Sequence, residues 1–314
     1  MSDQVNPAHF ACPLTFMGLP FAHDLENARA AVAGLPFDVG TDPHRIGARH
    51  GPRAIRIESG RVGRQFPPDA DVDVPAALGA VDCGDVRLTP SYLDEAHENI
   101  ERAIGEIAEA GSVPYTMGGD GTVTLPQLRA LSRRRPGLVV LHVDAHTDAV
   151  YGSGRAAATG TTFTRAAEEG LIDTGASMHV GVRGPHKGGG VYHQSAEQGY
   201  VLVNFAELRA RGIPDVLAEV HARMSGRPVY VCWDMDFFDP AFAPGVCAPT
   251  PGGASTEEGL AIVDGLGGLD IVAVDVNTVS PPHDPGGVTA LLAARIMVQF
   301  MLLQWRRESK RDEQ

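Results

Sequence analysis

The chain has 314 residues, of which 43% are hydrophobic, so it is long enough to bury one large core. Its formal net charge of -13 argues against nucleic acid as a partner, because no Lys/Arg cluster is large enough to compete for phosphates. The N-terminus lacks a basic region followed by an apolar run, and no stretch approaches the roughly 18 apolar residues of a membrane span. We therefore expect one soluble domain over residues 1–314, with no nucleic-acid or membrane partner.

The cysteines also indicate the compartment. Cys12, Cys83, Cys232 and Cys247 show no CxxC spacing, and a disulfide scaffold would be denser in a much shorter chain. A reduced, cytoplasmic protein is therefore expected.

In chain order, short apolar runs alternate with amphipathic stretches, which is typical of a parallel sheet flanked by helices. Residues 30–35 read as a strand. Residues 93–107 carry apolar side chains three and four positions apart, which predicts a helix with one buried face. Residues 138–143 form a continuous apolar run, as expected of a strand buried on both faces. Further strands are predicted at 112–117, 229–233 and 271–276, and further helices at 125–134, 162–169, 214–224, 256–266 and 288–303.

Three other segments are expected to lie outside regular structure. Glycine-rich stretches at 184–190 and 244–253 fall between predicted elements, where functional loops of α/β proteins usually lie. The charged tail after Gln304 is expected to fray.

Polar clusters follow two of the apolar strands. Asp144, His146 and Asp148 come directly after residues 138–143, and Asp234 and Asp236 come after residues 229–233. Residues two apart on an extended backbone point to one side, and ligands bind outside the carboxyl ends of such strands. Each cluster alone has an ordinary explanation, since Asp often caps a helix and a single His is usually a hydrogen-bonded core residue. Burying four carboxylates together without a cation would be costly, so these five residues are predicted metal ligands.

Both clusters resemble motifs of a known family. DAHTD at 144–148 and DMDFFDP at 234–240 resemble the two metal signatures of the ureohydrolases, the family of arginase and agmatinase. Residues 34–57 resemble its first strand and substrate-side loop, and TRAAEEGL, DPAFAPG and VSPPHD followed by TALLAA are most similar to agmatinase. The resemblance covers nearly the whole chain.

The resemblance implies a three-layer α/β/α, arginase-like fold with a central parallel sheet, and assembly into trimers or hexamers. It also implies a dinuclear manganese, sometimes nickel, site, at which a shared hydroxide attacks a guanidinium carbon and releases urea. The family's metal ligands match Asp144, His146, Asp148, Asp234 and Asp236, and Asp239 matches a carboxylate that orients the site without binding metal.

Three positions depart from the family pattern. Gly121 stands where the Gly-Gly-Asp-His motif has its histidine ligand, and Thr159 stands where agmatinase-like members have a proton-shuttling histidine. Threonine cannot carry protons near neutral pH. Thr278 stands where a family glutamate holds the substrate's guanidinium. The first metal thus loses a ligand, and the reaction loses a proton carrier and a substrate anchor.

The ligands of the second metal remain complete in Asp144, His146, Asp234 and Asp236. We therefore expect one divalent cation, manganese or nickel, rather than two. Carboxylate and imidazole ligands alone do not select between these metals. A histidine from elsewhere could enter the site, and His44, His50 and His283 are candidates, although each also reads as an ordinary loop residue.

Two hypotheses follow. In the first, the chain is a weakly active or non-catalytic subunit that assembles with an active paralogue of a guanidino or biguanide C–N hydrolase. Two-component members of the family, such as metformin hydrolase, offer a precedent for that arrangement. In the second, the chain is a divergent, active, metal-dependent amidinohydrolase with a changed guanidino-type substrate. A binding or regulatory protein on the same fold is a third, weaker reading.

Overall fold

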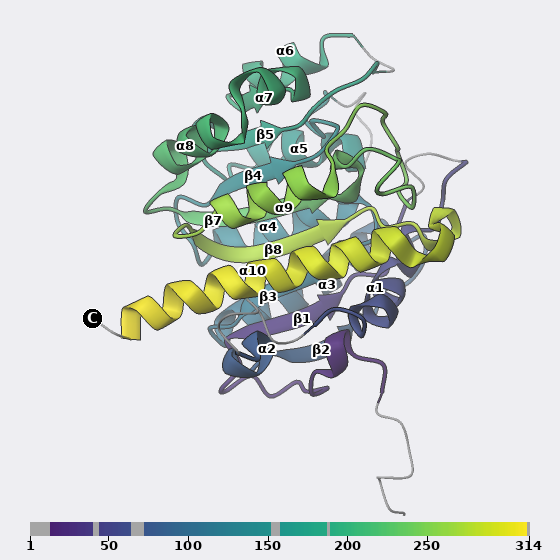
Figure 1. Cartoon of the computed structure of the whole chain (residues 1–314), viewed down its shortest axis with the longest axis vertical. Coiled ribbons are helices and arrows are strands. Elements are labelled where there is room, and N and C mark those ends of the chain that lie inside the picture. The colour runs from purple at the N-terminus through teal and green to yellow at the C-terminus, as the bar shows by residue number, and fades with distance from the viewer. Residues whose placement is uncertain (1–12, 40–43, 64–71, 152–157, 187–188, 313–314) are drawn as a thin grey trace, which may run out of the picture.

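A computed structural model describes residues 13–39, 44–63, 72–151, 158–186 and 189–312. These residues form one eight-stranded sheet with helices on both faces (Figure 1). The strands are β1 (Ala30–Gly34), β2 (Val81–Asp85), β3 (Val113–Met117), β4 (Val139–Val143), β5 (Met178–Val180), β6 (Val201–Val203), β7 (Pro228–Asp234) and β8 (Asp270–Asn277). The helices are α1 (Gly51–Ser59), α2 (Val74–Ala77), α3 (Leu93–Glu109), α4 (Thr124–Ser132), α5 (Thr162–Glu168), α6 (Val191–Glu197), α7 (Phe205–Arg211), α8 (Ile213–Met224), α9 (Thr256–Gly265) and α10 (Val288–Asp312).

The strand order is β2-β1-β3-β8-β7-β4-β5-β6, and every neighbouring pair is parallel. All carboxyl ends therefore meet along one edge of the sheet, as in other open α/β folds. In the register of β4 and β7, His142 lies beside Cys232 and Val143 beside Trp233. The polar residues that follow these strands are thus brought to neighbouring positions.

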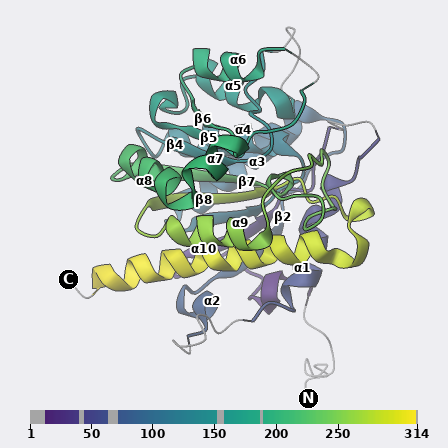
Figure 2. The ribbon, with the colours of Figure 1, turned by 45° about the horizontal axis from the view of Figure 1, so that its top comes forward.

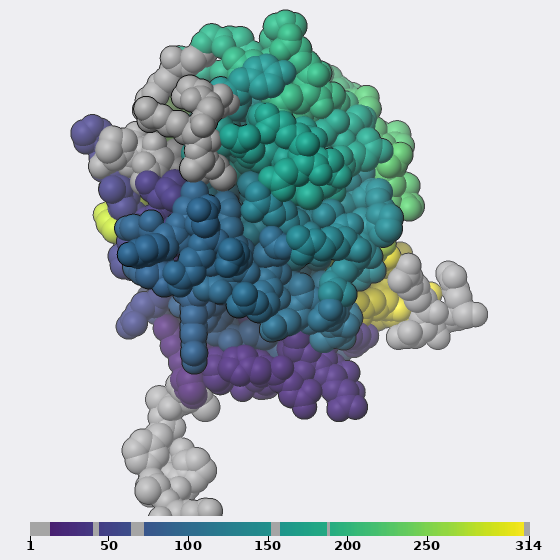
Figure 3. Space-filling view, turned by 180° about the vertical axis from the view of Figure 1, so that it is seen from behind, coloured from purple at the N-terminus to yellow at the C-terminus, as the bar shows by residue number. Residues whose placement is uncertain are grey.

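Alternate residues of each strand face two separate cores. Leu141 and Val143 of β4 face a core built with α1, α2, α7, α8, α9 and α10, which lie on the near side of the sheet in Figure 1. Val140 of the same strand faces a second core built with α3, α4 and α5, which cover the opposite face in Figure 3. The predicted three-layer α/β/α architecture is confirmed.

Helix α10 differs from its prediction. It runs to Asp312, whereas the sequence predicted an end near 303 and a fraying tail. The tail is helical because Trp305 packs against the core and Arg307 pairs with Asp270 at 2.5 Å. Gln304 adds a hydrogen bond, accepted by its Oε1 from the Tyr115 hydroxyl at 2.9 Å. Figure 2 shows the end of α10 projecting beyond the sheet.

The same helix also bears on whether the chain contains a segment that could cross a membrane. The segment Pro285–Lys310 is long and apolar enough to cross a membrane, contrary to the sequence expectation, but 72% of its apolar window is buried inside the protein. Burial against the sheet explains its composition, since helices that are apolar all round also occur in the cores of large domains.

The other predicted strands and helices are present, with ends within about two residues of expectation. Strands β2, β5 and β6 were not predicted, nor were helices α1, α2, α6 and α7. The stretch 244–253 lies between β7 and α9, and 184–190 between β5 and α6, although residues 187–188 lie outside the described residues. Cys83, Cys232 and Cys247 are free, and Cys12 lies outside the described residues.

Candidate metal centre

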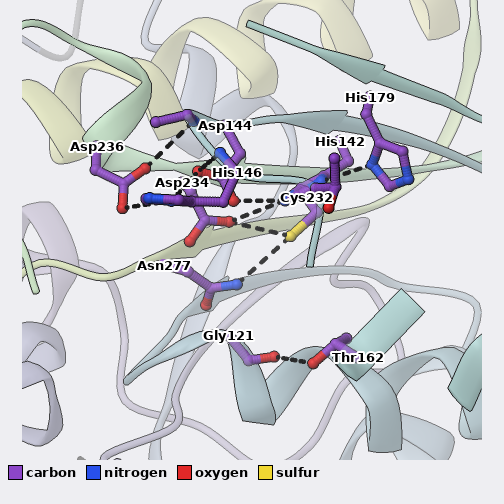
Figure 4. A network of polar contacts seen from close by, with 12 residues as sticks. Gly121, His142, Asp144, His146, Thr162, His179, Cys232, Asp234, Asp236 and Asn277 are labelled. Carbon is purple, nitrogen blue, oxygen red and sulfur yellow. Dashed lines mark hydrogen bonds and ion pairs between the residues drawn. The ribbon is translucent and has the colours of Figure 1, made fainter. Parts of the chain in front are cut away.

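The two sequence clusters meet at the carboxyl ends of β4 and β7. Asp144 follows the last residue of β4, and Asp234 is the last residue of β7. Because the strands are adjacent and in register, the side chains of both clusters converge in one buried network (Figure 4). The structure thus brings together the predicted residues Asp144, His146, Asp148, Asp234 and Asp236, and their role as ligands stays a prediction.

Asp144, His146 and Asp236 form one compact group. The Nδ1 atom of His146 lies 3.3 Å from Oδ1 of Asp144 and 3.5 Å from Oδ2 of Asp236. The backbone N–H of His146 also donates to Oδ1 of Asp144 at 3.0 Å, which fixes the turn after β4. One ligand atom from each of the three residues lies within 4.8 Å of the others, a separation that one cation can bridge.

The electrostatics of the cluster favour a cation. Asp144, Asp148, Asp234 and Asp236 are each 7% exposed or less. Burial and the charge of Asp144 raise the pKa of Asp234 to about 6, and the same two causes raise the pKa values of Asp148 and Asp236 well above the usual range. Such carboxylates take up protons unless positive charge, from an imidazolium or a cation, is brought to them. The donor set of buried carboxylates and an imidazole therefore suits a divalent metal.

Gly121 lies in a short turn, Gly121–Val123, before α4. Its carbonyl accepts a hydrogen bond from the Thr162 hydroxyl at 3.0 Å. A Cβ atom at this position would lie 2.9 Å from Cγ2 of Thr159 and 3.1 Å from Oδ2 of Asp148. Position 121 therefore has no room for a side chain, because Thr159 approaches it too closely. Two departures from the family pattern are neighbours in space.

Thr278 lies just beyond β8 with a φ of 70°, a conformation unusual for a β-branched residue. It is 4% exposed. Its hydroxyl donates to its neighbour's carbonyl, that of Asn277, at 2.7 Å and accepts from the backbone N–H of Met235 at 3.2 Å. The bond from Met235 ties the end of β7 to the residue that follows β8, and the neutral Thr278 side chain offers no charge to a guanidinium.

Asp239 organises a loop. Its carboxylate accepts hydrogen bonds from the backbone N–H groups of Ala241 at 2.9 Å and Gly252 at 2.7 Å. The same loop carries Thr250, whose hydroxyl lies 3.5 Å from Nε2 of His146. Asp239 therefore shapes the wall beside His146, in keeping with a residue that orients the site without binding metal, although that role stays a prediction.

Sequence reasoning missed two side chains that lie against Asp144 and Asp234. His142 is fully buried, and its Nε2 lies 3.0 Å from Oδ2 of Asp144 and 3.5 Å from Oδ2 of Asp234. Cys232 is 1% exposed, and its Sγ lies 3.5 Å from the same oxygen of Asp234. Each residue stands two positions before an aspartate on its strand. The alternation that grouped the aspartates could therefore have found both.

The histidines proposed from the sequence as substitutes do not fill this place. His44 and His50 are exposed, and His283 contacts the Ser280 hydroxyl through Nδ1 at 2.9 Å. Besides His146, the ring of His142 reaches the buried carboxylates, because this residue of β4 lies beside the end of the neighbouring strand β7.

Comparison with known proteins places the chain in a family. Residues 28–303 match the Arginase family. A guanidinobutyrase from Pseudomonas aeruginosa is 37% identical over 291 residues, covering 91% of this chain and 91% of that protein. The structure is similar to that of a hypothetical agmatinase from Burkholderia thailandensis, with a TM-score of 0.87, 31% identity and coverage of 96% and 93% of the two chains.

A second solved structure carries metal. The formiminoglutamase of Trypanosoma cruzi with Mn²⁺ has a TM-score of 0.83 to this chain at 25% identity, covering 93% of this chain and 98% of its own. Family, fold and buried donor set agree, and the chain belongs to the arginase family as an agmatinase-like ureohydrolase.

Proposed function

We propose that this chain is a metal-binding subunit of a hydrolase that cleaves C–N bonds of linear guanidino compounds, and that its own turnover is weak. The observation that carries the proposal is the contrast within one site. The carboxylates and His146 converge in a buried cluster, whereas Gly121, Thr159 and Thr278 replace the groups on which the reaction depends in the family.

The substrate class is supported by the relatives. The guanidinobutyrase and the agmatinase-like structure are named for guanidino compounds, which share a planar, cationic group. We expect a small substrate of that type and a urea- or guanylurea-type product. The residues that would hold a manganese or nickel ion are Asp144, His146, Asp234 and Asp236. A divalent cation there would supply Lewis-acid activation of water and polarisation of the carbon under attack.

The weak turnover follows from the chain's own residues. Thr159 cannot exchange protons with a leaving amine near pH 7. Thr278 uses its hydroxyl in backbone hydrogen bonds and brings no negative charge to a guanidinium. If each loss lowers the rate by about tenfold to a thousandfold, their product is severe.

We further propose that the chain works in the cytoplasm as one ureohydrolase-like domain, within a trimer or hexamer that includes an active paralogue. The test is to express the chain alone and together with a paralogue that keeps all family motifs. Urea release from guanidino acids, agmatine and a biguanide would be measured with Mn²⁺ or Ni²⁺. We expect little turnover from the chain alone and co-purification of the two chains.

A matched pair of variants sharpens this test. Asp236→Asn in this chain should leave turnover of the mixed complex nearly unchanged, whereas the equivalent change in the paralogue should abolish it. The proposal fails if the chain alone turns over a guanidino compound at a rate comparable with the paralogue.

The second candidate is a divergent, active amidinohydrolase. One observation favours it: all four buried aspartates are retained, although a purely structural subunit would gain stability from replacing them with apolar residues. Turnover by the purified chain that disappears in Asp236→Asn would establish this alternative.

A further inference from the structure

We propose that His142 supplies the nitrogen ligand of a second cation position, together with Asp144 and Asp148, in place of the histidine that position 121 lacks. The inference goes beyond the proposed function and requires only that the centre binds cations. It replaces the sequence-based expectation of a single cation with two.

The distances fit a shared cation. One ligand atom each from His142, Asp144 and Asp148 lies within 4.8 Å of the others. Ligand atoms bonded about 2.1 Å from one cation stand about 3.0 to 3.4 Å apart. Nε2 of His142 lies 3.0 Å from Oδ2 of Asp144 and 3.5 Å from Oδ2 of Asp234.

Asp144 is placed to bridge two positions. Its Oδ1 faces His146 at 3.3 Å and its Oδ2 faces His142 at 3.0 Å, so each carboxylate oxygen has its own imidazole. Asp236 completes the group around His146, and Asp148 the group around His142. Figure 4 shows the two imidazoles reaching Asp144 from different directions. Two adjacent cation positions that share one carboxylate account for this arrangement.

The orientation of the His142 ring is the second observation. Nε2 is fully buried and, among the described residues, has no hydrogen-bond partner of acceptable geometry, although Oδ2 of Asp144 lies 3.0 Å away. Ligands that surround a common ion point at the ion rather than at one another. An imidazole nitrogen directed between two carboxylate oxygens, 3.0 Å from one and 3.5 Å from the other, has the geometry of such a ligand.

The contact made by the other ring nitrogen is compatible with the tautomer that metal binding requires. Nδ1 of His142 lies 2.9 Å from Nδ1 of His179, so one of the two must donate and the other accept. If His142 donates, its Nε2 carries the lone pair that a metal needs. Metal-binding histidines are commonly held in this way through the second nitrogen. The ring of Phe163, with its centroid 4.4 Å from that of His142, further restricts rotation.

Position 121 cannot provide the ligand instead. The Cβ atom of any side chain there would lie 2.9 Å from Thr159 and 3.1 Å from the Asp148 carboxylate. The histidine of the second position therefore comes from β4, and its donor set of one imidazole and carboxylates suits a divalent transition metal such as nickel.

The test is metal stoichiometry, which does not depend on activity. The full chain would be stripped with a chelator and titrated with Ni²⁺ alone, and bound metal counted by mass spectrometry and calorimetry. We expect two ions per chain. His142→Asn keeps a polar atom near Nδ1 and removes Nε2, so it should bind one ion and weaken the second binding event at least tenfold. His97→Asn is the matched control, because His97 is a buried histidine of α3 and should still allow two ions.

If the His142 variant does not fold, a second measurement on a different variant tests the same proposal. In His146→Asn loaded with Mn²⁺, electron spin echo spectroscopy should still detect a coupled imidazole nitrogen, which must then come from His142. One ion in the wild type, two unchanged ions in His142→Asn, or no nitrogen coupling in His146→Asn would each overturn the inference. None of these outcomes depends on turnover, so the proposed function is tested separately.

Discussion

A methyl group of Thr159 lies 2.9 Å from the place that a Cβ atom at Gly121 would take. Real Cβ atoms do not approach a neighbour so closely, so a residue larger than glycine at 121 must push Thr159 aside. The absence of a histidine at 121 and the presence of threonine at 159 are thus sterically linked. Restoring the family's histidine is a problem of packing as well as of chemistry.

Gly121→His is therefore expected to lower the free energy of unfolding by about 1–3 kcal/mol without increasing urea release, because the extra side chain overpacks the turn. In Gly121→His/Thr159→Ala the Cγ2 contact is gone and part of the lost stability should return, because Cβ of residue 159 is 3.8 Å away. Urea denaturation measures the free energy of unfolding of the single and the double variant. Wild-type stability in the single variant would contradict the steric link.

Removing divalent cations should lower the melting temperature. The buried carboxylates repel one another without positive charge, and a cation that binds only the folded state at a hundred times its Kd stabilises that state by about 2.7 kcal/mol. Calorimetric melting after chelation, and again after adding Mn²⁺ or Ni²⁺, measures the response. Asp236→Asn should show a smaller rise on metal addition, whereas Asp264→Asn, on α9 away from the cluster, should respond like the wild type. Equal responses in both variants would argue against metal binding by Asp236.

Asp38 predicts an acid-sensitive contribution to stability. Burial raises its pKa, but hydrogen bonds from the Arg49 side chain at 2.7 Å and from backbone N–H groups, with the Arg49 charge, outweigh burial and hold the pKa below its usual value. The lower folded-state pKa means that this stability is present above the unfolded value of about 3.9 and is lost as pH falls through the folded value.

Asp38→Asn should therefore lower the free energy of unfolding by about 1–3 kcal/mol at pH 7, and the gap to the wild type should narrow below about pH 4. Urea unfolding of both proteins across this range measures the gap. A gap that is constant with pH would show that Asp38 acts through packing rather than charge.

Arg56 and Asp82 form a buried pair on which the N-terminal part of the sheet depends. Nε and Nη2 of Arg56 donate to the two oxygens of Asp82 at 2.8 and 2.9 Å, and both residues are buried. Arg56→Met leaves the carboxylate buried without its cation and should lower the free energy of unfolding by about 3–5 kcal/mol. Arg223→Met, which removes a more exposed pair with Glu219, should lower it by less than about 1 kcal/mol. Similar losses in the two variants would contradict this account.

The sequence predicted the strands that build the centre because β4, β7 and β8 are mainly apolar and are followed by, or end in, polar residues. Strands β5 and β6 have three residues each, too short for any periodicity to appear. The length of α10 depends on Trp305 and Arg307 meeting the core and Asp270, and these contacts cannot be read from local sequence.

The metal-ligand candidates, too, could be predicted from local sequence only in part. The aspartates were predictable because their spacing along one strand fixes their direction. His142 obeys the same spacing, but its importance depends on the register of β4 with β7, which places it beside Cys232 and close to Asp234. The contact between residues 121 and 159 joins two turns 38 positions apart, and only the folded chain brings them together.

Two of the positions that depart from the family lie on different parts of the fold from the matching aspartates. Asp144 and Asp234 stand at the ends of paired strands, whereas Gly121 and Thr159 lie in short turns; Thr278, the third, directly follows β8. Strand ends are held by the hydrogen bonds of the whole sheet, so their geometry survives changes in the surrounding turns. A chain of this architecture can therefore exchange the groups that handle substrate and protons while its cation-binding frame stays in place. Changes at these positions can therefore alter or abolish the reaction on amidines while the sheet stays the same.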